Sequence, residues 1–276
     1  MKFIYRLVFV ILFISALTSC TVEKQTAKTF VENRNKISVL ILKPDYIYKE
    51  NKKTADVEDY EKLSEEERES KLLKASKFLQ FVNDSSFIQD YSQSLIDELE
   101  NYNLNVFTAN NIDSFLMIDT LAYVFKISQM ELDEYIYTSR ESDYFDYERY
   151  YQDFDLNAVG LYVWMDFSIQ NDNINSPVTL FANNFVSDKI DGRFKKRYLY
   201  DDVVYVYTRK NMLLSRVNKF SKNAGKKHAS YIFDYLLNHV IKAKNPNYKD
   251  LELLHFDRKR EKLQYVPEGS FIIIDD

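Results

Sequence analysis

The clearest pattern in the chain is an alternation of side chains over residues 158–169 (AVGLYVWMDFSI), where every second residue is apolar. A period of two residues is typical of a strand with one buried face, and residues 178–186 are expected to pair beside it. Continuous apolar runs at 37–43, which Pro44 ends, and at 104–107 predict buried strands. Further strand-like segments are 122–137, 251–266 and 271–274.

Helices are predicted where apolar residues recur every three or four positions. Ser64 and Glu67 form a capping-box pair before a charged helix that runs to about Phe81. Ser86, with Gln89, is expected to cap a second helix that turns an apolar stripe to the core. That stripe consists of Ile88, Tyr91, Leu95, Ile96, Leu99 and Tyr102. Other helical segments are predicted at 110–117, 201–222 and 230–243.

These elements predict an α/β (α+β) fold, in which a mixed sheet carries helices packed on it. The domain is expected to cover residues 37–276, because no convincing linker and no internal repeat divides that range. The middle of the chain is rich in strand signals, which favours hairpins there. The polar segment 45–63 is expected to be irregular.

The first 20 residues have the layout of a secretory signal. Lys2 and Arg6 supply positive charge, an apolar run covers 7–17 (LVFVILFISAL), and small residues precede Cys20. The run is short for a membrane-spanning helix, which needs about 20 apolar residues. Cys20 is also the single cysteine of the chain, so no disulfide can form within it.

The ending Leu17-Thr18-Ser19-Cys20 resembles the lipobox of bacterial lipoproteins. The resemblance implies that a signal peptide, residues 1–19, is removed and that the sulfur of Cys20 carries a diacylglycerol. Several acyl chains anchor a protein stably, so we expect a membrane-tethered chain. An ordinary signal peptide or signal anchor with an incidental cysteine is the alternative interpretation.

Residues 20–36 are expected to be the lipidated cysteine and a polar tether, which reaches roughly 50 Å when fully extended. Thr21 is not the aspartate that retains some lipoproteins at the inner membrane. An acidic run that marks surface export in other lipoproteins is also missing. We therefore expect an outer-membrane anchor with the folded domain facing the periplasm.

Composition and motifs exclude several classes of protein. The formal net charge is −5 at pH 7, which argues against a general nucleic-acid binder. Only four glycines occur, too few for a glycine-rich phosphate cradle. His228, His239 and His255 form no HxxxH pair, and His239 reads as a core residue of an apolar helix. No nucleophile elbow occurs either, so we expect no enzyme activity, no metal and no cofactor.

The segment 137–155 (YTSRESDYFDYERYYQDFD) interleaves six acidic residues with aromatic ones. Aromatic faces beside carboxylates suit sugar rings, so Tyr144, Tyr147, Tyr150 and Tyr151 are a candidate glycan platform. Glycoside hydrolysis would need two carboxylates about 5–10 Å apart. A solvated hairpin or helix-turn is the alternative.

Positive charge gathers in 193–227, where eleven Lys and Arg residues stand against two Asp residues. A basic face can hold anionic lipid head groups or an acidic partner, each charge near a membrane adding about 1 kcal/mol. The candidate partner surface consists of Lys195, Lys196, Arg197, Lys219 and Lys222. A solvated helix face is the alternative.

The order of elements resembles periplasmic lipoprotein domains related to the amino-terminal domain of TolB. The residues that carry the likeness are the strand VLILK, the helix SFIQDYSQSLIDELENY and the strand LNVF, followed by long strands and a helix pair. That group includes penicillin-binding-protein activators, curli-type secretion lipoproteins and transport-auxiliary lipoproteins. The likeness covers about residues 37–243. The chain lacks the glycine that the family often has after its first helix pair, and no binding residue is carried over.

The sequence thus predicts a non-enzymatic cell-envelope lipoprotein that acts as an accessory or assembly factor and binds a protein partner. The alternative is a glycan- or peptidoglycan-binding lipoprotein, or a glycan hydrolase, that uses the segment 137–155. The curli-type resemblance adds an oligomeric secretion component, which would need amphipathic strands able to enter a membrane.

Overall fold

The computed structural model describes residues 22–120, 122–170, 177–197, 199, 202–245 and 253–274. A seven-stranded sheet has the order β11-β6-β5-β4-β1-β3, and β2 pairs with part of β4. β1 lies parallel to its neighbours β3 and β4, whereas β4, β5, β6 and β11 pair in antiparallel fashion. The strands of this sheet are β1 (Ser38–Leu42), β2 (Tyr48–Asn51), β3 (Asn105–Phe107), β4 (Ala122–Phe145), β5 (Glu148–Ile169), β6 (Val178–Ser187) and β11 (Ile272–Ile274).

Two further antiparallel hairpins form two-stranded sheets of their own. They are β7 (Lys189–Arg197) with β8 (Asp202–Lys210), and β9 (Leu253–Asp257) with β10 (Lys262–Val266). The helices are α2 (Glu65–Ala75), α3 (Asp84–Asn101), α4 (Ile112–Leu116) and α5 (Leu214–Lys244), and residues 22–32 are also helical. Short 3₁₀ turns occupy Arg34–Lys36, Thr54–Asp56, Tyr60–Lys62, Leu79–Phe81 and Ala109–Asn111.

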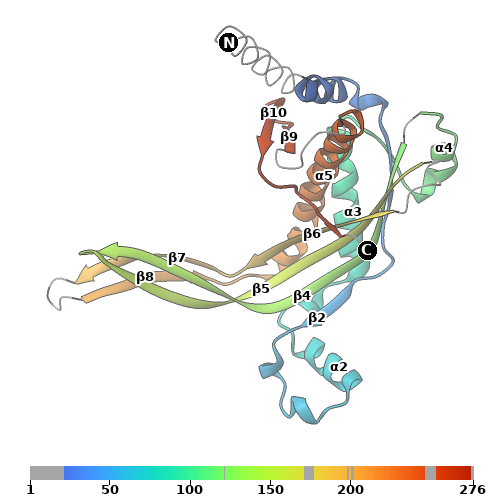
Figure 1. Ribbon diagram of the computed structural model, residues 1–276. Coiled ribbons are helices and arrows are strands. Elements are labelled where there is room, and N and C mark those ends of the chain that lie inside the picture. Colours follow the sequence, from blue (N-terminus) through green and yellow to red (C-terminus); the bar gives the residue numbers. More distant parts are fainter. Residues whose placement is uncertain are drawn as a thin grey trace, which may run out of the picture.

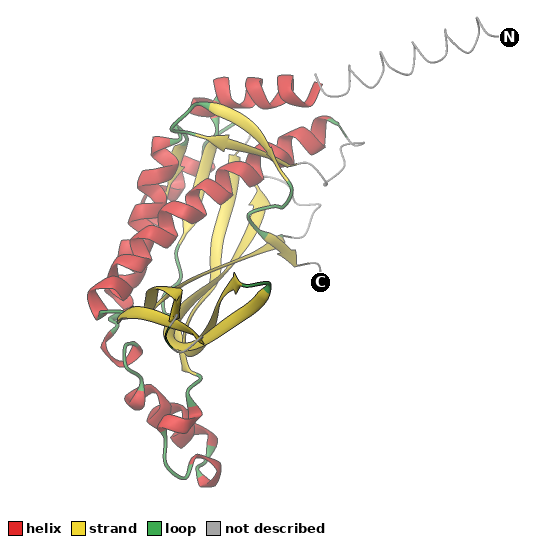
Figure 2. Ribbon diagram, turned by 90° about the vertical axis from the view of Figure 1, so that its left-hand side faces the viewer, coloured by secondary structure: helices red, strands yellow, loops and turns green. Residues whose placement is uncertain are grey.

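The main core lies between the sheet and the pair α3 and α5, which cover the same face (Figures 1 and 2). This core explains the alternation of apolar residues in 158–169, because Val159, Leu161 and Val163 point to the helices and are fully buried. The predicted stripe of α3 is buried with them, apart from Ile96, which is half-buried. The predicted α/β class, a mixed sheet with helices packed on it, is confirmed.

The helix α5 (Leu214–Lys244) is a single long helix. The sequence predicted two helices in this region, at 201–222 and 230–243. Gly225 lies inside α5, in the stretch between the two predicted helices. Its function is close packing, because a Cβ atom at Gly225 would lie 2.3 Å from the backbone oxygen of Tyr91 in α3. The missing side chain therefore allows the two helices to cross at contact distance.

The predicted helix at 201–222 is wrong in its first half. Asp202–Lys210 is strand β8, and its partner is β7, with Arg197 opposite Asp202. Val203 and Val206 are three residues apart, which imitates helical spacing, but they lie on a strand whose pairing decides its conformation.

The segment before β1 is folded, so the expectation of an extended tether is wrong from Val22 onward. Ala27 is fully buried and Phe30 is 6% exposed, with its ring centroid 5.5 Å from that of Phe233 in α5. Lys24 lies over the ring of Tyr265 in β10, 5.3 Å from its centroid. Residues 1–21, with the signal segment and Cys20, lie outside the described residues.

Helix starts agree partly with the sequence. Ser64 and Glu67 form the predicted capping box at α2, with the Ser64 amide donating to Glu67 Oε2 at 3.1 Å. α2 ends at Ala75, before the predicted limit. α3 starts earlier than predicted, because the side chain of Asn83 accepts a hydrogen bond from the Ser86 amide at 2.9 Å and caps the helix.

The segment 45–63 is less irregular than predicted, because it contains β2, which a buried carboxylate on β4 helps to hold. Glu134 is fully buried and accepts hydrogen bonds from the backbone amides of Lys77, Phe78 and Leu79 at 2.8–3.2 Å. Lys53, just after β2, lies 2.8 Å from the same carboxylate. Glu134 thus joins the loops that flank α2 to the sheet.

Candidate functional site

The segment 137–155 belongs to the distal part of a long hairpin, so its hairpin interpretation is confirmed. β4 and β5 pair continuously from the sheet to Phe145 opposite Glu148, with a bulge between Ile127 and Gln129. Asp146 and Tyr147 make the turn with φ values of 49° and 70°. Two consecutive positive φ values are typical of a type I′ turn, which matches the twist of the strands.

The hairpin β7–β8 packs on this distal part. Phe154 of β5 is 8% exposed, and its ring lies 5.4 Å and 4.8 Å from the rings of Tyr205 and Tyr207 in β8. Phe194 of β7 joins the contact, 4.7 Å from Tyr205. Figure 1 shows both hairpins projecting together from the body. We call residues 137–155 together with β7–β8 the two-hairpin arm.

A buried carboxylate fixes the base of the arm. Asp188, between β6 and β7, is 1% exposed and accepts hydrogen bonds from the Met212 amide at 2.6 Å and from Arg209 at 2.8 Å. Asn157 of β5 donates to it through its backbone and its side chain. Burial raises the pKa of Asp188, but these hydrogen bonds outweigh burial and lower the pKa to about 2. β7 is therefore held where it leaves the sheet.

One side of the arm, which we call its outer face, carries arginine and tyrosine side chains from both strands. It consists of Arg140, Tyr144, Arg149, Tyr151 and Asp153. Tyr144 and Tyr151 are 64% and 53% exposed. The Arg149 guanidinium lies over both rings, 5.6 Å and 5.0 Å from their centroids. Arg140 holds Asp153 across the strands through two hydrogen bonds of 2.7 Å.

The four predicted platform tyrosines do not share this face. Tyr150 is adjacent to Tyr151 along β5 and points to the opposite side, which packs on β7–β8. Its hydroxyl donates to Glu148 at 3.1 Å. Tyr147 is fully exposed at the turn. The structure therefore brings Tyr144 and Tyr151 together and separates them from the other two.

The predicted basic surface is also divided. Lys196 contacts Asp146 at the tip of the arm, so the acidic and basic segments pair within the molecule. Lys195 and Arg197 lie on the same strand, β7, and are exposed. Arg197 pairs with Asp202 of β8.

The two remaining residues of that surface are on another element. Lys219 and Lys222 are exposed on α5, which is not part of the arm. Lys222 lies 3.3 Å from Asp90 of α3. The five basic residues therefore do not form one surface.

The three histidines have separate environments. His228 is fully buried between the Tyr91 hydroxyl at 2.7 Å and Asn184 at 2.6 Å. Burial, with a smaller effect of Lys227, lowers the pKa of His228 to about 3, so it is a neutral core residue.

The other two histidines belong to the region around the carboxyl-terminal half of α5. His255 lies 2.6 Å from Asp234, which is buried. Burial raises the pKa of Asp234, whereas the hydrogen bond to Asp234 raises that of His255. His239 is half-buried among rings, 5.2 Å from that of Phe167, which differs from the expected core position.

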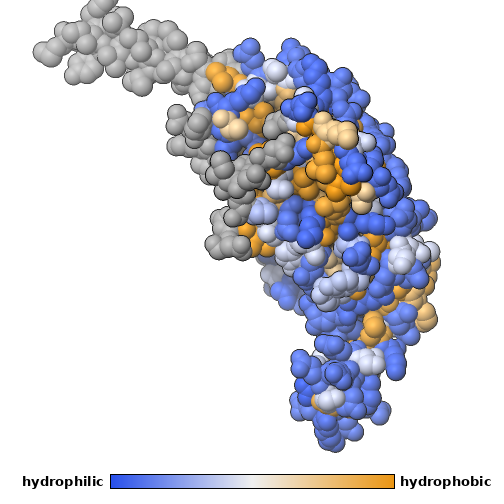
Figure 3. Space-filling model, turned by 90° about the vertical axis from the view of Figure 1, so that its right-hand side faces the viewer, coloured by the Kyte–Doolittle hydropathy of each residue, from blue (hydrophilic) through white to orange (hydrophobic). Residues whose placement is uncertain are grey.

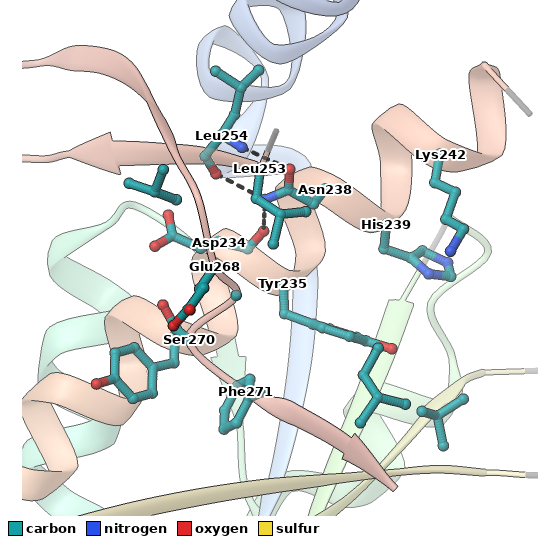
Figure 4. Close-up of a pocket in the computed structure, with 15 residues that line it drawn as sticks. Asp234, Tyr235, Asn238, His239, Lys242, Leu253, Leu254, Glu268, Ser270 and Phe271 are labelled. Carbon is teal, nitrogen blue, oxygen red and sulfur yellow. Dashed lines mark hydrogen bonds between the residues drawn. The ribbon is translucent and has the colours of Figure 1, made fainter. Parts of the chain in front are cut away.

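A cavity of about 610 Å³ lies between α5 and the strands β9, β10 and β11 (Figure 4). Its wall is mainly apolar, with Tyr235 in the centre, and Asn238 fixes one side by bonding the backbone of Leu254 in both directions at 2.8–2.9 Å. Figure 4 shows Asp234 and Glu268 on one side of Tyr235 and His239 and Lys242 on the other. Such a lining suits a small amphipathic molecule. The sequence analysis interpreted His239 as a core residue and did not indicate the cavity.

Apolar side chains also gather on the side of the molecule that carries α4 (Figure 3). Leu116 and Met117 are 62% and 80% exposed, whereas Phe115 is buried against Leu40. α4 therefore docks through one residue and presents its neighbours to solvent.

Among the described residues, one group has the spacing of a metal site. It consists of Glu50, Glu131 and Asp133. The sequence did not indicate this group, because Glu50 of β2 is far from Glu131 and Asp133 along the chain. Only the pairing of β2 with β4 brings the three side chains together. No helix in the described part of the chain is long and apolar enough to span a membrane. Comparison with protein-family models and with curated proteins finds no match for this chain.

Proposed function

We propose that this chain is a non-enzymatic accessory or assembly factor of the cell envelope. In this proposal a lipid on Cys20 anchors it to the outer membrane, the domain faces the periplasm, and the outer face of the two-hairpin arm binds a protein partner. The observation that carries the proposal is the exposure of Tyr144 and Tyr151 on an element that projects from the body.

The composition of the outer face suits a protein interface. Tyrosine and arginine are enriched among the residues that dominate binding energy at such interfaces. Here Arg149 already lies over the rings of Tyr144 and Tyr151, and Arg140 is held by Asp153. Side chains that are ordered before binding lose less conformational entropy when a partner docks. The packing of β7–β8 behind the face stabilises its backbone for the same purpose.

A membrane anchor would make a modest intrinsic affinity for the partner sufficient. Confinement of two proteins to one membrane raises their effective concentration, so binding in the cell can be strong without a large interface. Replacing Cys20 by serine tests this part of the proposal, because labelled palmitate should then no longer enter the protein. Labelling that persists in the variant would contradict lipidation at Cys20.

The partner is tested by crosslinking in cells, purification in mild detergent and mass spectrometry. We expect a stoichiometric envelope protein that is lost in the double variant Tyr144→Ala/Tyr151→Ala. Tyr46→Ala/Tyr48→Ala is the matched control, because these two tyrosines are similarly exposed, at 57% and 49%, but lie at β2. A partner that survives the arm variant and is lost in the control would refute the role of the outer face.

A second function, glycan binding, is favoured by one feature of the same face, where Tyr151 and Asp153 are neighbours on one side of β5. The hydrogen bond from Arg140 lowers the pKa of Asp153. An ionised carboxylate can accept hydrogen bonds that sugar hydroxyl groups donate, but it cannot act as a general acid. This function predicts that the protein sediments with peptidoglycan and that the arm variant does not. Recovery of glycan without a protein partner would place glycan binding first.

A further inference from the structure

Three carboxylates meet on the face of the sheet opposite α3 and α5. Glu131 and Asp133 are two residues apart on β4 and therefore point the same way, and Glu50 of β2 lies directly opposite Asp133 in the pairing. One oxygen of each carboxylate lies within 4.8 Å of the others. The group includes an exposed, a half-buried and a fully buried residue, so solvent reaches one side of it.

An unpaired buried oxygen of Asp133 is a second observation that points to a ligand at this group. Its side chain is 1% exposed, and its Oδ1 atom has no hydrogen-bond partner among the described residues. Buried carboxylate oxygens are normally satisfied, because leaving one unpaired costs its full desolvation. The other oxygen, Oδ2, lies 2.5 Å from the Lys52 ammonium, which is also 3.6 Å from Glu50. One ammonium faces three carboxylates, so the cluster retains net negative charge when all three are ionised.

The geometry points to a binding site for a hard divalent cation, with Ca²⁺ as the ion that fits it, formed by Glu50, Glu131 and Asp133. Ca²⁺ takes carboxylate oxygens at 2.3–2.6 Å, so two ligand atoms of one ion can lie up to about 5 Å apart. The Oδ1 atom of Asp133 would supply the buried ligand. Glu50 and Glu131 would supply the ligands nearer to solvent, and waters would complete the coordination.

Lys52 acts as the counter-ion when no cation is bound. Its side chain is 46% exposed, and its ammonium lies 5.9 Å from the ring centroid of Tyr162, so it has a route out of the cluster over that ring. A cation and the ammonium compete for the same carboxylates. Removal of the Lys52 charge should therefore tighten cation binding, which a cluster that merely forms an ion pair would not show.

The test is a titration of the full chain in mild detergent with Tb³⁺, whose luminescence is excited through nearby tyrosine rings, followed by displacement with Ca²⁺. We expect saturable luminescence that Ca²⁺ displaces better than Mg²⁺. Asp133→Asn should weaken binding at least about 10-fold, which equals about 1.4 kcal/mol. Lys52→Met should tighten it by a similar factor.

The matched control is Glu141→Gln/Asp143→Asn, because these acids have the same two-residue spacing on the same strand but belong to the arm. Its affinity should equal that of the unaltered chain. If Asp133→Asn does not fold, Glu131→Gln and Lys52→Met decide the matter. Absence of saturable binding in both the unaltered chain and Lys52→Met would overturn the proposal, and so would equal loss in the arm control. Stronger displacement by Mg²⁺ would overturn the assignment to Ca²⁺.

Discussion

Gly225→Ala tests the packing of α3 on α5. The substitution should stabilise an isolated helix, but we expect it to destabilise this protein. In a helix that is free on all sides, alanine is more favourable than glycine by about 1 kcal/mol. In this chain the new Cβ atom would lie 2.3 Å from the Tyr91 backbone oxygen, whereas ordinary contacts begin at 3.4 Å. The two helices must therefore move apart by about 1 Å, and they carry fully buried residues such as Leu95 and Ile232.

Overpacking of this kind costs about 3 kcal/mol at the upper end of its usual range. After the gain in helix propensity, we expect a net loss of about 2 kcal/mol, which lowers the melting temperature by about 4–8 °C for a domain of this size. Urea unfolding followed by circular dichroism measures the loss. Asn223→Ala is the control, since this exposed residue lies two positions away on α5 and should gain about 0.5 kcal/mol. If Gly225→Ala stabilises the chain as the control does, the close crossing of the helices is wrong.

Three more variants examine buried polar groups. Because burial lowers the pKa of His228 to about 3, this histidine stays neutral in the folded chain, whereas it takes up a proton in the unfolded chain below about pH 6.5. This difference should lower the free energy of unfolding by up to about 1.4 kcal/mol per pH unit as pH falls. Urea midpoints measured between pH 6.5 and 5 should therefore depend less on pH in His228→Gln, and equal slopes in the two proteins would contradict this. Asp188→Asn should cost about 2 kcal/mol and accelerate amide exchange in β7–β8 before the rest of the sheet, whereas uniform exchange would argue against a local role. Glu134→Gln should cost about 3 kcal/mol in urea unfolding, because Lys53 loses a buried partner, and a loss below 0.5 kcal/mol would show that this carboxylate is dispensable.

The elements that the sequence predicted well are those with one buried face. Val159, Leu161 and Val163 produce a clear period of two because helices cover one side of β5. Tyr91 and Leu95 produce the helical period of α3 for the same reason. In each case the buried positions are apolar, so the spacing of apolar residues indicates which face of the strand or helix is buried.

The two-hairpin arm has no such pattern, since most of its residues are solvated on at least one side. Its strands are held by pairing along the ladder, by cross-strand contacts such as Arg140 with Asp153, and by the small contact around Phe154. A lone chain segment does not contain this information, which explains why 202–210 was read as a helix. The sequence also pointed to Tyr144 and Tyr151 but not to their separation from Tyr150, because facing depends on strand register.

The sequence did not indicate the group of Glu50, Glu131 and Asp133 for a related reason. Glu131 and Asp133 are adjacent on one face of β4, but Glu50 is about 80 residues earlier in the chain. Only the parallel pairing of β2 with β4 brings it opposite them. Acidic residues are so frequent here that no spacing in the sequence distinguishes this group from others.

The helix at 22–32 changes what a lipid on Cys20 would do. The backbone between Cys20 and Val22 spans at most about 7 Å, whereas an extended tether would have allowed roughly 50 Å. Because Ala27 and Phe30 are part of the core, the domain would remain close to the bilayer and would turn about a short pivot. Its partner would then meet a narrow set of orientations at nearly constant height. The anchor would therefore hold the protein at the membrane and would also set the distance of the arm from the bilayer, which determines the partners that the arm can contact.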